Sequence, residues 1–391
     1  MISSISKPQT RPTVASLDVE RLAARMVGIG FHGHDLVGAP KELIRRGVRN
    51  VILFSRNIED PSQLARLNHE IKAAAGDSPL MISVDQEGGR VLRMREPFTI
   101  IPSARELGRI GDEKLAYQIG CILAREARAV NFDMDLAPVM DVDTNPANQV
   151  ICSRSFGDCS KLVARMGVAV LRGLQDNGVG ACVKHFPGHG DTLKDSHHEL
   201  PTLPDHDLER LLKIELPPFE AAIKAGVAGV MSSHVIYTPI DGVYPATLSH
   251  AIIDGILRKR LGFNGLVASD DMQMKAIADH YGFDDALIHG ALAGVDLFWI
   301  CHSADLQDRA IRVLAKAVEA GDIPRSRLEE AIRRQDVVFA RFVRPAHRAP
   351  RADVIGAAAH KALADRIRRL ADVTIADGED PTEVFARQQA V

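Results

Sequence analysis

Cysteine is scarce in this sequence and follows no pattern. The five cysteines are odd in number, scattered along the chain, and form no CxxC pair. A disulfide framework needs an even set at regular spacing, and a thiolate zinc site needs closely spaced pairs. Neither kind of site is therefore expected from Cys121, Cys152, Cys159, Cys182 and Cys301.

Long apolar runs are absent as well. The N-terminal stretch MISSISKPQTRPTV has no apolar core like that of a signal peptide, and no segment approaches the roughly 18 apolar residues that predict a membrane span. We therefore expect a cytoplasmic protein that makes no contact with a membrane.

Charge of a single sign is not concentrated anywhere. The net charge is −3, and acidic and basic residues are interleaved rather than blocked. Nucleic acids and anionic membranes are bound by basic stripes, so neither is expected as a partner. With 46% hydrophobic and 25% charged residues, the chain resembles a soluble globular protein with a large core. A small or neutral ligand fits this composition best.

Short apolar runs alternate with amphipathic stretches from about residue 18 onward. The runs are suited to strands that are buried on both faces. Eight such runs occur, at 26–31, 51–54, 81–84, 132–139, 181–185, 229–233, 266–269 and 295–300. Stretches with helical spacing include 104–130, 161–177, 208–224 and 306–320.

Eight strands that alternate with helices predict an α/β fold of the TIM-type (β/α)8 barrel class. An open doubly wound sheet would alternate in the same way. The barrel is favoured because no glycine-rich phosphate-binding turn follows the first run and because polar residues gather where the runs end. The first run is the weakest, so the barrel is expected to be irregular there.

The domain limits follow from composition. Residues 1–17 are polar and aperiodic, which predicts a flexible N-terminal tail. The barrel is expected over 18–345. Residues 346–391 then hold a linker, an alanine-rich helix at 352–371 and a short apolar piece at 373–376, and what remains is too short for a second domain.

The densest polar cluster is VKHFPGHGDTLKDSHHELP, residues 183–201. It follows a predicted strand, and loops at the C-terminal ends of barrel strands build active sites. Asp195 and His197 are two residues apart, so the carboxylate can reach the imidazole and fix its tautomer. Such a histidine donates and accepts protons near neutral pH, which predicts an acid/base pair on a loop.

A metal site is the alternative for this cluster. His185 and His189 belong to no HExxH motif and flank a Pro-Gly turn, so they do not share a helical face. However, FHGHD places His32 and His34 as an HxH after the first run, a pattern of two-metal amidohydrolase barrels. A metal-dependent amidohydrolase that uses these histidines, His185 and an aspartate therefore stays open.

A second cluster, LVASDDMQM, ends a predicted strand in Asp270 and Asp271. Adjacent acids at that position are costly unless they are solvated or used. Capping of the next helix accounts for Asp271 and leaves Asp270 unexplained. Alternation along the strand does not choose between the two.

Two further polar segments follow predicted strands. In VDQEGGRVLRM, Asp85 closes a strand, and Arg90 and Arg93 follow a Gly-Gly turn. In DVDTNPANQVICSRSFG, a long loop carries Arg154, and loops of this length in compact domains tend to be functional. A solvated surface arginine is the alternative for Arg154.

Together these segments closely resemble glycoside hydrolase family 3, in its β-N-acetylhexosaminidase branch. The resemblance runs in order over residues 20–340, and KHFPGHGDT…DSH is its most specific motif. Its other parts are LFSRNI, DQEGGRVLR, DLAPVMDVDTNPAN, RSFG, MSSHVIYTPID, PATLS, LRKRLGFNGLVASDDMQMKAI and AGVDLF.

The resemblance implies a TIM-like barrel and a retaining double displacement through a covalent glycosyl-enzyme. It implies that Asp270 is the nucleophile and that His197, held by Asp195, is the acid/base. The residues it implies for binding the sugar are Asp85, Arg93, Arg154, Lys184 and His185.

Two positions depart from the family pattern. Cys152 stands where glycine is usual, and Gln273 stands where a serine or an acidic residue is common. These changes bear on fine specificity. The helix at 352–371 resembles the entry to the second domain of longer relatives, so any wall that such a domain supplies must come from the barrel or another subunit.

The sequence thus predicts an exo-acting, retaining β-N-acetylglucosaminidase without a metal or other cofactor. Its expected partner is a small carbohydrate with terminal β-linked N-acetylglucosamine, such as a muropeptide of peptidoglycan recycling. Because a histidine acid/base tolerates an anionic acceptor better than a carboxylate does, an N-acetylglucosaminide phosphorylase is an open variant. A metal-dependent amidohydrolase and a non-catalytic sugar-binding barrel also stay open as functions from different classes.

Overall fold

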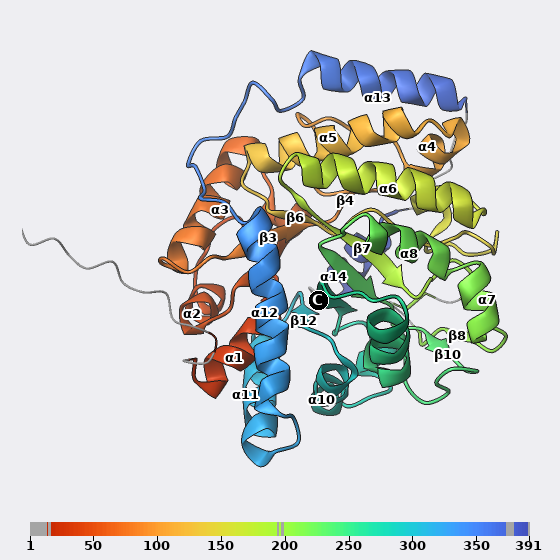
Figure 1. The fold of residues 1–391 in the computed structure, drawn as a ribbon. Helices are drawn as coiled ribbons and strands as arrows, with labels where there is room; N and C mark the ends of the chain where they lie inside the picture. The colour runs from red at the N-terminus through yellow and green to blue at the C-terminus, as the bar shows by residue number, and fades with distance from the viewer. Residues whose placement is uncertain (1–13, 15–16, 194, 197–198, 373–378, 390–391) are drawn as a thin grey trace, which may run out of the picture.

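The computed structural model describes residues 14, 17–193, 195–196, 199–372 and 379–389. Eight parallel strands close into a barrel that helices surround (Figure 1), which confirms the predicted TIM-type fold. In barrel order the strands are β1 (Val27–Ile29), β12 (Leu297–Ile300), β11 (Leu266–Asp271), β9 (Gly229–Ser232), β7 (Gly180–Phe186), β6 (Met134–Asp135), β3 (Met81–Val84) and β2 (Asn50–Leu53).

Helices cover the outside of the barrel. The α-helices up to the last strand are α1 (Val19–Arg25), α2 (Ala39–Arg46), α3 (Pro61–Ala74), α4 (Ala104–Ile110), α5 (Glu113–Ala129), α6 (Ser160–Asp176), α7 (Leu208–Lys213), α8 (Leu216–Lys224), α9 (Lys275–Ala278) and α10 (Phe283–Ala293). After it come α11 (Ala304–Ala320), α12 (Arg325–Phe342), α13 (Ala358–Ala371) and α14 (Pro381–Gln389). Shorter elements are the helical turns η2 (Ser55–Asn57), η3 (Cys152–Arg154) and η4 (Ala246–Leu248), the π-helix η5 (Ala251–Arg260), and the strand pairs β4 (Gln86–Gly88) with β5 (Val91–Leu92) and β8 (Thr202–Leu203) with β10 (Ile236–Tyr237).

The first strand is short, but the barrel is closed at that point. Strand β1 pairs with β12 on one side and with β2 on the other. Gly28 lies in the middle of this strand, and a Cβ atom added to it would lie 2.3 Å from the ring of Trp299. The glycine therefore makes room for the indole inside the barrel, which explains why the first apolar run looks weak.

A plug of apolar side chains fills the N-terminal end of the barrel. Phe339 and Phe342 of α12 pack in the same buried cluster as Met81, Met134 and Leu297, which begin barrel strands. A second and larger core lies between the strands and the outer helices. Helix α12 thus closes the N-terminal end of the barrel, which leaves the C-terminal end for a ligand site.

Two stretches that were predicted as single helices are each broken in two. The stretch 104–130 forms α4 and α5, because Gly111 adopts a left-handed conformation with φ 68° and Asp112 caps the start of α5. The stretch 208–224 forms α7 and α8. Gly111 ends one helix as glycine commonly does at such positions.

Two helices of the segment after the barrel, α13 and α14, pack back against it. Helix α13 packs against α4 and α5, where His360 lies 2.8 Å from the buried carboxylate of Glu126. The apolar piece predicted at 373–376 and most of the predicted tail at 1–17 lie outside the described residues. Helix α14 was not predicted, and in Figure 1 it projects onto the middle of the barrel.

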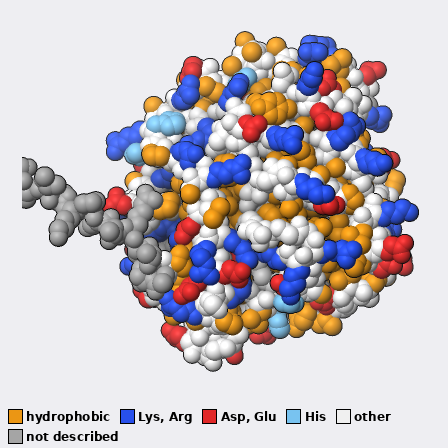
Figure 2. Space-filling model, in the orientation of Figure 1, with side chains coloured by type: hydrophobic (Ala, Val, Ile, Leu, Met, Phe, Trp, Pro, Cys, Tyr) orange, Lys and Arg blue, Asp and Glu red, His pale blue; other side chains and the backbone are white. Residues whose placement is uncertain are grey.

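The surface carries charges of both signs. On the face drawn in Figure 2, Lys and Arg side chains are interspersed with Asp and Glu. Across the described part of the chain, no helix combines the length and the apolar character that crossing a bilayer requires.

Candidate active site

A cavity lies at the C-terminal ends of the barrel strands. Five of the residues predicted to act in the site line it together: Asp85, Arg154, Lys184, His185 and Asp270. They come from four different strand ends and their loops, which is how barrel enzymes assemble their sites.

A buried charge network forms one side of the cavity. The Lys184 ammonium, at the end of β7, donates to Asp85 at 2.6 Å and lies 2.7 Å from Glu87. The Arg154 guanidinium donates through two nitrogens to Glu87, each at 2.8 Å. These paired, charge-assisted contacts hold both cations in fixed positions beside the cavity.

Burial and charge together set the protonation states in this network. Burial alone would raise the pKa of Glu87, but Arg154 and Lys184 outweigh it and hold that pKa well below the ordinary value. Burial would lower the pKa of Lys184, but Asp85 and Glu87 raise it above its usual range. Glu87 is therefore an anion and Lys184 a cation near neutral pH.

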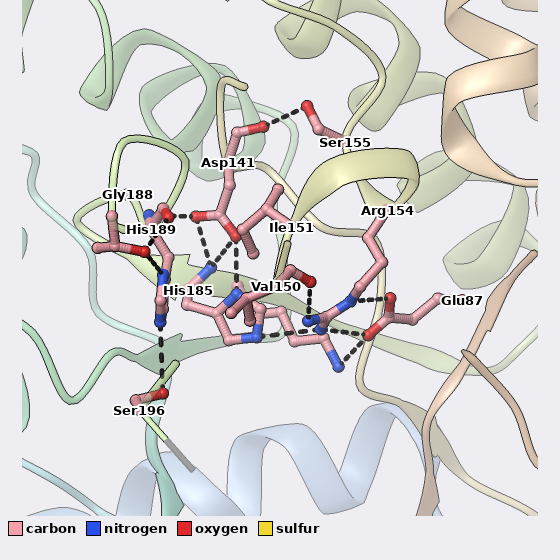
Figure 3. Close-up of polar contacts among 12 residues, drawn as sticks. Glu87, Asp141, Val150, Ile151, Arg154, Ser155, His185, Gly188, His189 and Ser196 are labelled. Atoms are coloured by element: carbon pink, nitrogen blue, oxygen red, sulfur yellow. Dashed lines mark hydrogen bonds and ion pairs between the residues drawn. The ribbon is translucent and has the colours of Figure 1, made fainter. Parts of the chain in front are cut away.

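His185 is held by Asp141, which lies in the loop after β6 (Figure 3). The Nδ1 atom lies 2.7 Å from the Asp141 carboxylate, and the same carboxylate accepts from the backbone N–H of His189 at 2.7 Å. A ring that donates Nδ1–H to Asp141 keeps Nε2 as an acceptor, and Arg154 lies 3.3 Å from that atom. The geometry thus fixes the orientation and tautomer of His185.

His189 connects this cluster to the loop at 186–200. Its Nδ1 lies 2.7 Å from Thr192 Oγ1 and its Nε2 lies 3.3 Å from Ser196 Oγ. Burial, together with the neighbouring His185, lowers the pKa of His189 to about 4. The ring is therefore neutral near pH 7, which suits a hydrogen-bonding support for the loop.

The predicted acid/base pair lies on that loop. Ser196 lines the cavity, and the carbonyl of Asp195 accepts from the N–H of Glu199 at 2.9 Å. His197 lies outside the described residues. The Asp195–His197 pair therefore stays a prediction, although the loop that carries it reaches the cavity through Ser196.

The two adjacent aspartates at the end of β11 differ in their surroundings. Asp271 accepts from the N–H groups of Gln273 at 3.1 Å and Cys301 at 3.3 Å, and it lies 3.2 Å from the ring of His302. Asp270 is half-buried and lines the cavity beside Lys184 and His185. Both aspartates line the cavity. Asp271 does not cap the next helix, as was predicted, because α9 begins after Met274 without a side-chain cap; its carboxylate instead holds the turn after β11 and the end of β12. The choice of Asp270 as the nucleophile stays a prediction.

Arg93 lies behind the cavity rather than on its wall. The β4–β5 hairpin carries it, and the side chain of Gln86 fixes the hairpin by accepting from the N–H groups of Arg93 and Met94 at 2.9 and 3.0 Å. The guanidinium lies 3.6 Å from Asp85 and pairs with Asp380. Arg93 therefore does not line the cavity itself but lies next to Asp85, which does.

The histidines that a metal-dependent amidohydrolase would use do not lie together around one metal position among the described residues. Among the described residues, no group of three or more His, Cys, Asp or Glu side chains is arranged to hold a metal ion. His185 is occupied by Asp141, and His32 faces His302, with ring centroids 6.4 Å apart. The structure thus offers this alternative no ligand set within its described part.

Several residues of the site were not predicted from the sequence. They are Glu87, Asp141, His189, Ser196, Trp299, Asp380 and Phe385. Glu87, Asp141, His189 and Ser196 belong to polar segments that the sequence had already singled out, so their positions carried a signal. Asp380 and Phe385 are separated from the barrel by a long stretch of chain and carried none.

The structure shows the surroundings of the two departures from the family pattern. Cys152 has φ 42°, in the left-handed region that favours glycine. Gln273 accepts from the N–H groups of His302 at 2.7 Å and Ser303 at 3.2 Å, so its amide supports the turn that leads into α11.

Comparison with known proteins adds independent information. The family model described as the glycosyl hydrolase family 3 N-terminal domain matches residues 24–337. The β-hexosaminidase of Thiobacillus denitrificans is 42% identical over 275 residues, which is 69% of this chain and 75% of that protein. The β-hexosaminidase of Bordetella avium is 39% identical over 76% of this chain and 86% of its own.

Solved structures agree with these relatives. A family 3 β-N-acetylglucosaminidase from Paenibacillus sp. superposes with a TM-score of 0.87 at 38% identity, covering 91% of this chain and 69% of its own. NagZ from Neisseria gonorrhoeae, in complex with N-trifluoroacetyl-D-glucosamine, superposes with a TM-score of 0.74 at 31% identity, covering 89% of this chain and 98% of its own.

Proposed function

Because the chain belongs to glycoside hydrolase family 3, in the branch of the β-N-acetylhexosaminidases, we propose that it is a retaining exo-β-N-acetylglucosaminidase. The observation that carries this proposal is the cavity that Asp270 lines together with the buried cations Lys184 and Arg154 and the oriented imidazole of His185. Such fixed donors suit the hydroxyl and N-acetyl groups of one sugar ring.

In the proposed mechanism, a carboxylate oxygen of Asp270 attacks the anomeric carbon as the glycosidic C–O bond breaks. His197, oriented by Asp195, gives its proton to the leaving oxygen. Water then attacks the glycosyl-Asp270 ester, gives a proton to His197 and releases the sugar. Two displacements at the same carbon retain its β configuration.

The hydrogen-bonded groups around the ring act by positioning. Asp85 accepts from sugar hydroxyls while Lys184 fixes its carboxylate, and Arg154 and His185 bind the opposite side of the ring. The names of its relatives support a terminal β-linked N-acetylglucosamine as the substrate in this proposal. Small muropeptides handled in the cytoplasm during peptidoglycan recycling are the proposed natural source.

Replacement of Asp270 tests the proposal. Asp270→Ala should lower the turnover of an aryl β-N-acetylglucosaminide by at least about a hundredfold, because the covalent step is lost. Asp271→Asn is the matched control, and it should keep far more activity. An Asp270→Ala enzyme with more than about a tenth of the wild-type rate would sink the assignment.

Labelling identifies the nucleophile directly. A slow fluorosugar inactivator should modify Asp270, and peptide mapping by mass spectrometry should find the label there. A label on Asp271, or none at all, would contradict the mechanism. Running the reaction with and without phosphate distinguishes hydrolysis from phosphorolysis, since only the latter releases a sugar phosphate.

A further inference from the structure

The last described helix lies against the cavity of the candidate active site. Thr382 and Phe385 of α14 line that cavity together with Asp270. Phe385 is only 1% exposed. The chain therefore brings an element of its C-terminal segment, which is no part of the barrel, to the place where the sugar is proposed to bind (Figure 1).

Helix α14 is anchored at two points on the rim of the barrel. The Glu383 carboxylate accepts from the backbone N–H of Ser55, after β2, at 3.3 Å. The ring of Phe385 packs edge-on against His302, after β12, with centroids 5.7 Å apart. Strands β2 and β12 flank β1, so the helix bridges the loops on either side of the first strand.

The third anchor is an ion pair inside the protein. Arg93 has no exposed side-chain surface, and its guanidinium pairs with the Asp380 carboxylate, which is only 3% exposed. On its other side Arg93 lies 3.6 Å from Asp85, which also accepts from Lys184. A buried cation needs a close counter-charge, and Asp85 is already shared. Asp380 supplies what the barrel lacks.

The balance of charges in the buried network around Arg93 and Lys184 also indicates a need for carboxylates from the C-terminal segment. Without α14 it holds three cations and two anions: Arg93, Arg154, Lys184, Asp85 and Glu87. Asp380 and Glu383, both close to the Arg93 guanidinium, bring the anions to four. The carboxylate of Asp85 can then face a sugar hydroxyl, because Arg93 no longer depends on it alone.

We propose that α14 completes the sugar-binding pocket, with Asp380 as a positioning residue for Arg93 and Asp85, and with Phe385 as a specificity-determining wall. The inference rests on the proposed function, since it names the part of the site that receives the terminal N-acetylglucosamine. The aromatic face supplies apolar contact to the C–H groups of the ring. The wall that was expected from the barrel or another subunit comes instead from the C-terminal segment of this chain.

The single tryptophan offers a test that does not depend on activity. Trp299 is the only tryptophan, is 1% exposed and lines the same cavity as Phe385. In the full-length chain, Phe385→Ala and Asp380→Asn should each increase the quenching of Trp299 fluorescence by acrylamide, because the cavity that Trp299 lines with Phe385 then opens to solvent. Arg387→Gln is the matched control on the same helix, since Arg387 is exposed, pairs with the exposed Glu379 and otherwise donates to the carbonyl of Glu383 in its own helix. It should leave quenching unchanged.

Steady-state kinetics on an aryl β-N-acetylglucosaminide test the role in binding. Asp380→Asn should raise KM by at least about tenfold and change kcat much less, because a hydrogen bond to a charged group is lost from the binding network and not from the reacting atoms. Phe385→Leu should recover most of the affinity that Phe385→Ala loses. Thermal melts establish that each variant is folded.

Two outcomes would overturn the inference. Unchanged quenching and KM in both variants would show that α14 does not form the pocket, and a rise in kcat/KM would show that the helix blocks it. If the variants differ from the wild type in quenching as expected but the wild-type protein does not hydrolyse the substrate, the proposed function is refuted and the docking of α14 still stands.

Discussion

At the scale of single residues, the site depends on carboxylates whose environments differ. Glu87 is ionised between two cations, whereas Asp135, just outside the cavity, has no such partner among the described residues. Its Oδ1 accepts from the N–H of Gln86 at 3.0 Å, and its Oδ2 is buried with no hydrogen-bond partner in that part of the chain. Burial raises the pKa of Asp135 well above its ordinary value of 3.8.

This raised pKa predicts a pH-dependent effect of Asp135→Asn. Between the ordinary value and the raised pKa, the folded protein binds more protons at this site than the unfolded chain, so the wild type loses stability as pH rises. The amide does not titrate. The variant should therefore gain stability relative to the wild type as pH increases from about 4 toward neutrality, by on the order of 1–3 kcal/mol.

Urea unfolding at a series of pH values measures this difference. Asp353→Asn is the control, because the Asp353 side chain is 71% exposed. Its difference from the wild type should stay nearly constant with pH. A flat or falling difference for Asp135→Asn would contradict the prediction.

Residue-scale features were only partly readable from the sequence. Asp85, Lys184 and Asp270 follow or end buried strands, and parallel strands bring such ends together, so their meeting was predictable. Glu87 was missed because a two-stranded hairpin turns it toward the network. Asp380 was missed because it is 287 positions from Arg93, and no local pattern spans that distance.

At the scale of elements, α5 and α6 approach each other through glycines. A Cβ added to Gly120 would lie 2.3 Å from the carbonyl oxygen of Val170 and 2.9 Å from the Cα of Gly173. The two backbones are therefore in direct contact. This close approach needs a residue without a side chain at the crossing.

Gly120→Ala should lower the free energy of unfolding by about 1–3 kcal/mol, because the backbones must separate even though alanine favours the helix. Gly255→Ala is the matched control, since its added Cβ would come no closer than 3.8 Å to a neighbouring atom. That substitution should be neutral or stabilising. Chemical denaturation of both variants checks the contrast, and equal effects would refute it.

Element boundaries were harder to predict than element types. The alternation of strands and helices identified the barrel, because buried parallel strands are continuous apolar runs. The break between α4 and α5 had a local signal in Gly111 followed by Asp112, a helix end and a helix cap. Apolar spacing alone did not separate them, since it continues across the break.

At the scale of the whole molecule, stability and chemistry occupy opposite ends of the barrel. Phe342 seals the N-terminal end, where its ring lies 3.2 Å from the position of a Cβ on Gly180. The cavity lies at the C-terminal end. Barrel enzymes in general separate these two functions in this way.

Phe342→Ala should therefore destabilise the protein by about 3–5 kcal/mol, the usual cost of a large cavity in a core. Below the melting temperature, kcat/KM should stay within about twofold of the wild type, because the plug is remote from the sugar. Val337→Ala, at a position 71% exposed on the same helix, is the control for stability. Thermal melts and initial rates on the same preparations compare the two properties, and a parallel loss of both would contradict the separation.

The position of α14 has a practical consequence for expression and immobilisation. An affinity tag, fluorescent protein or surface linker joined after α14 would begin close in sequence to Thr382 and Phe385, which line the cavity. One joined ahead of α1 would begin on the outer helical layer, where α1 packs against α11 and α12. Fusions and immobilised forms of this enzyme should therefore be attached through the N-terminus.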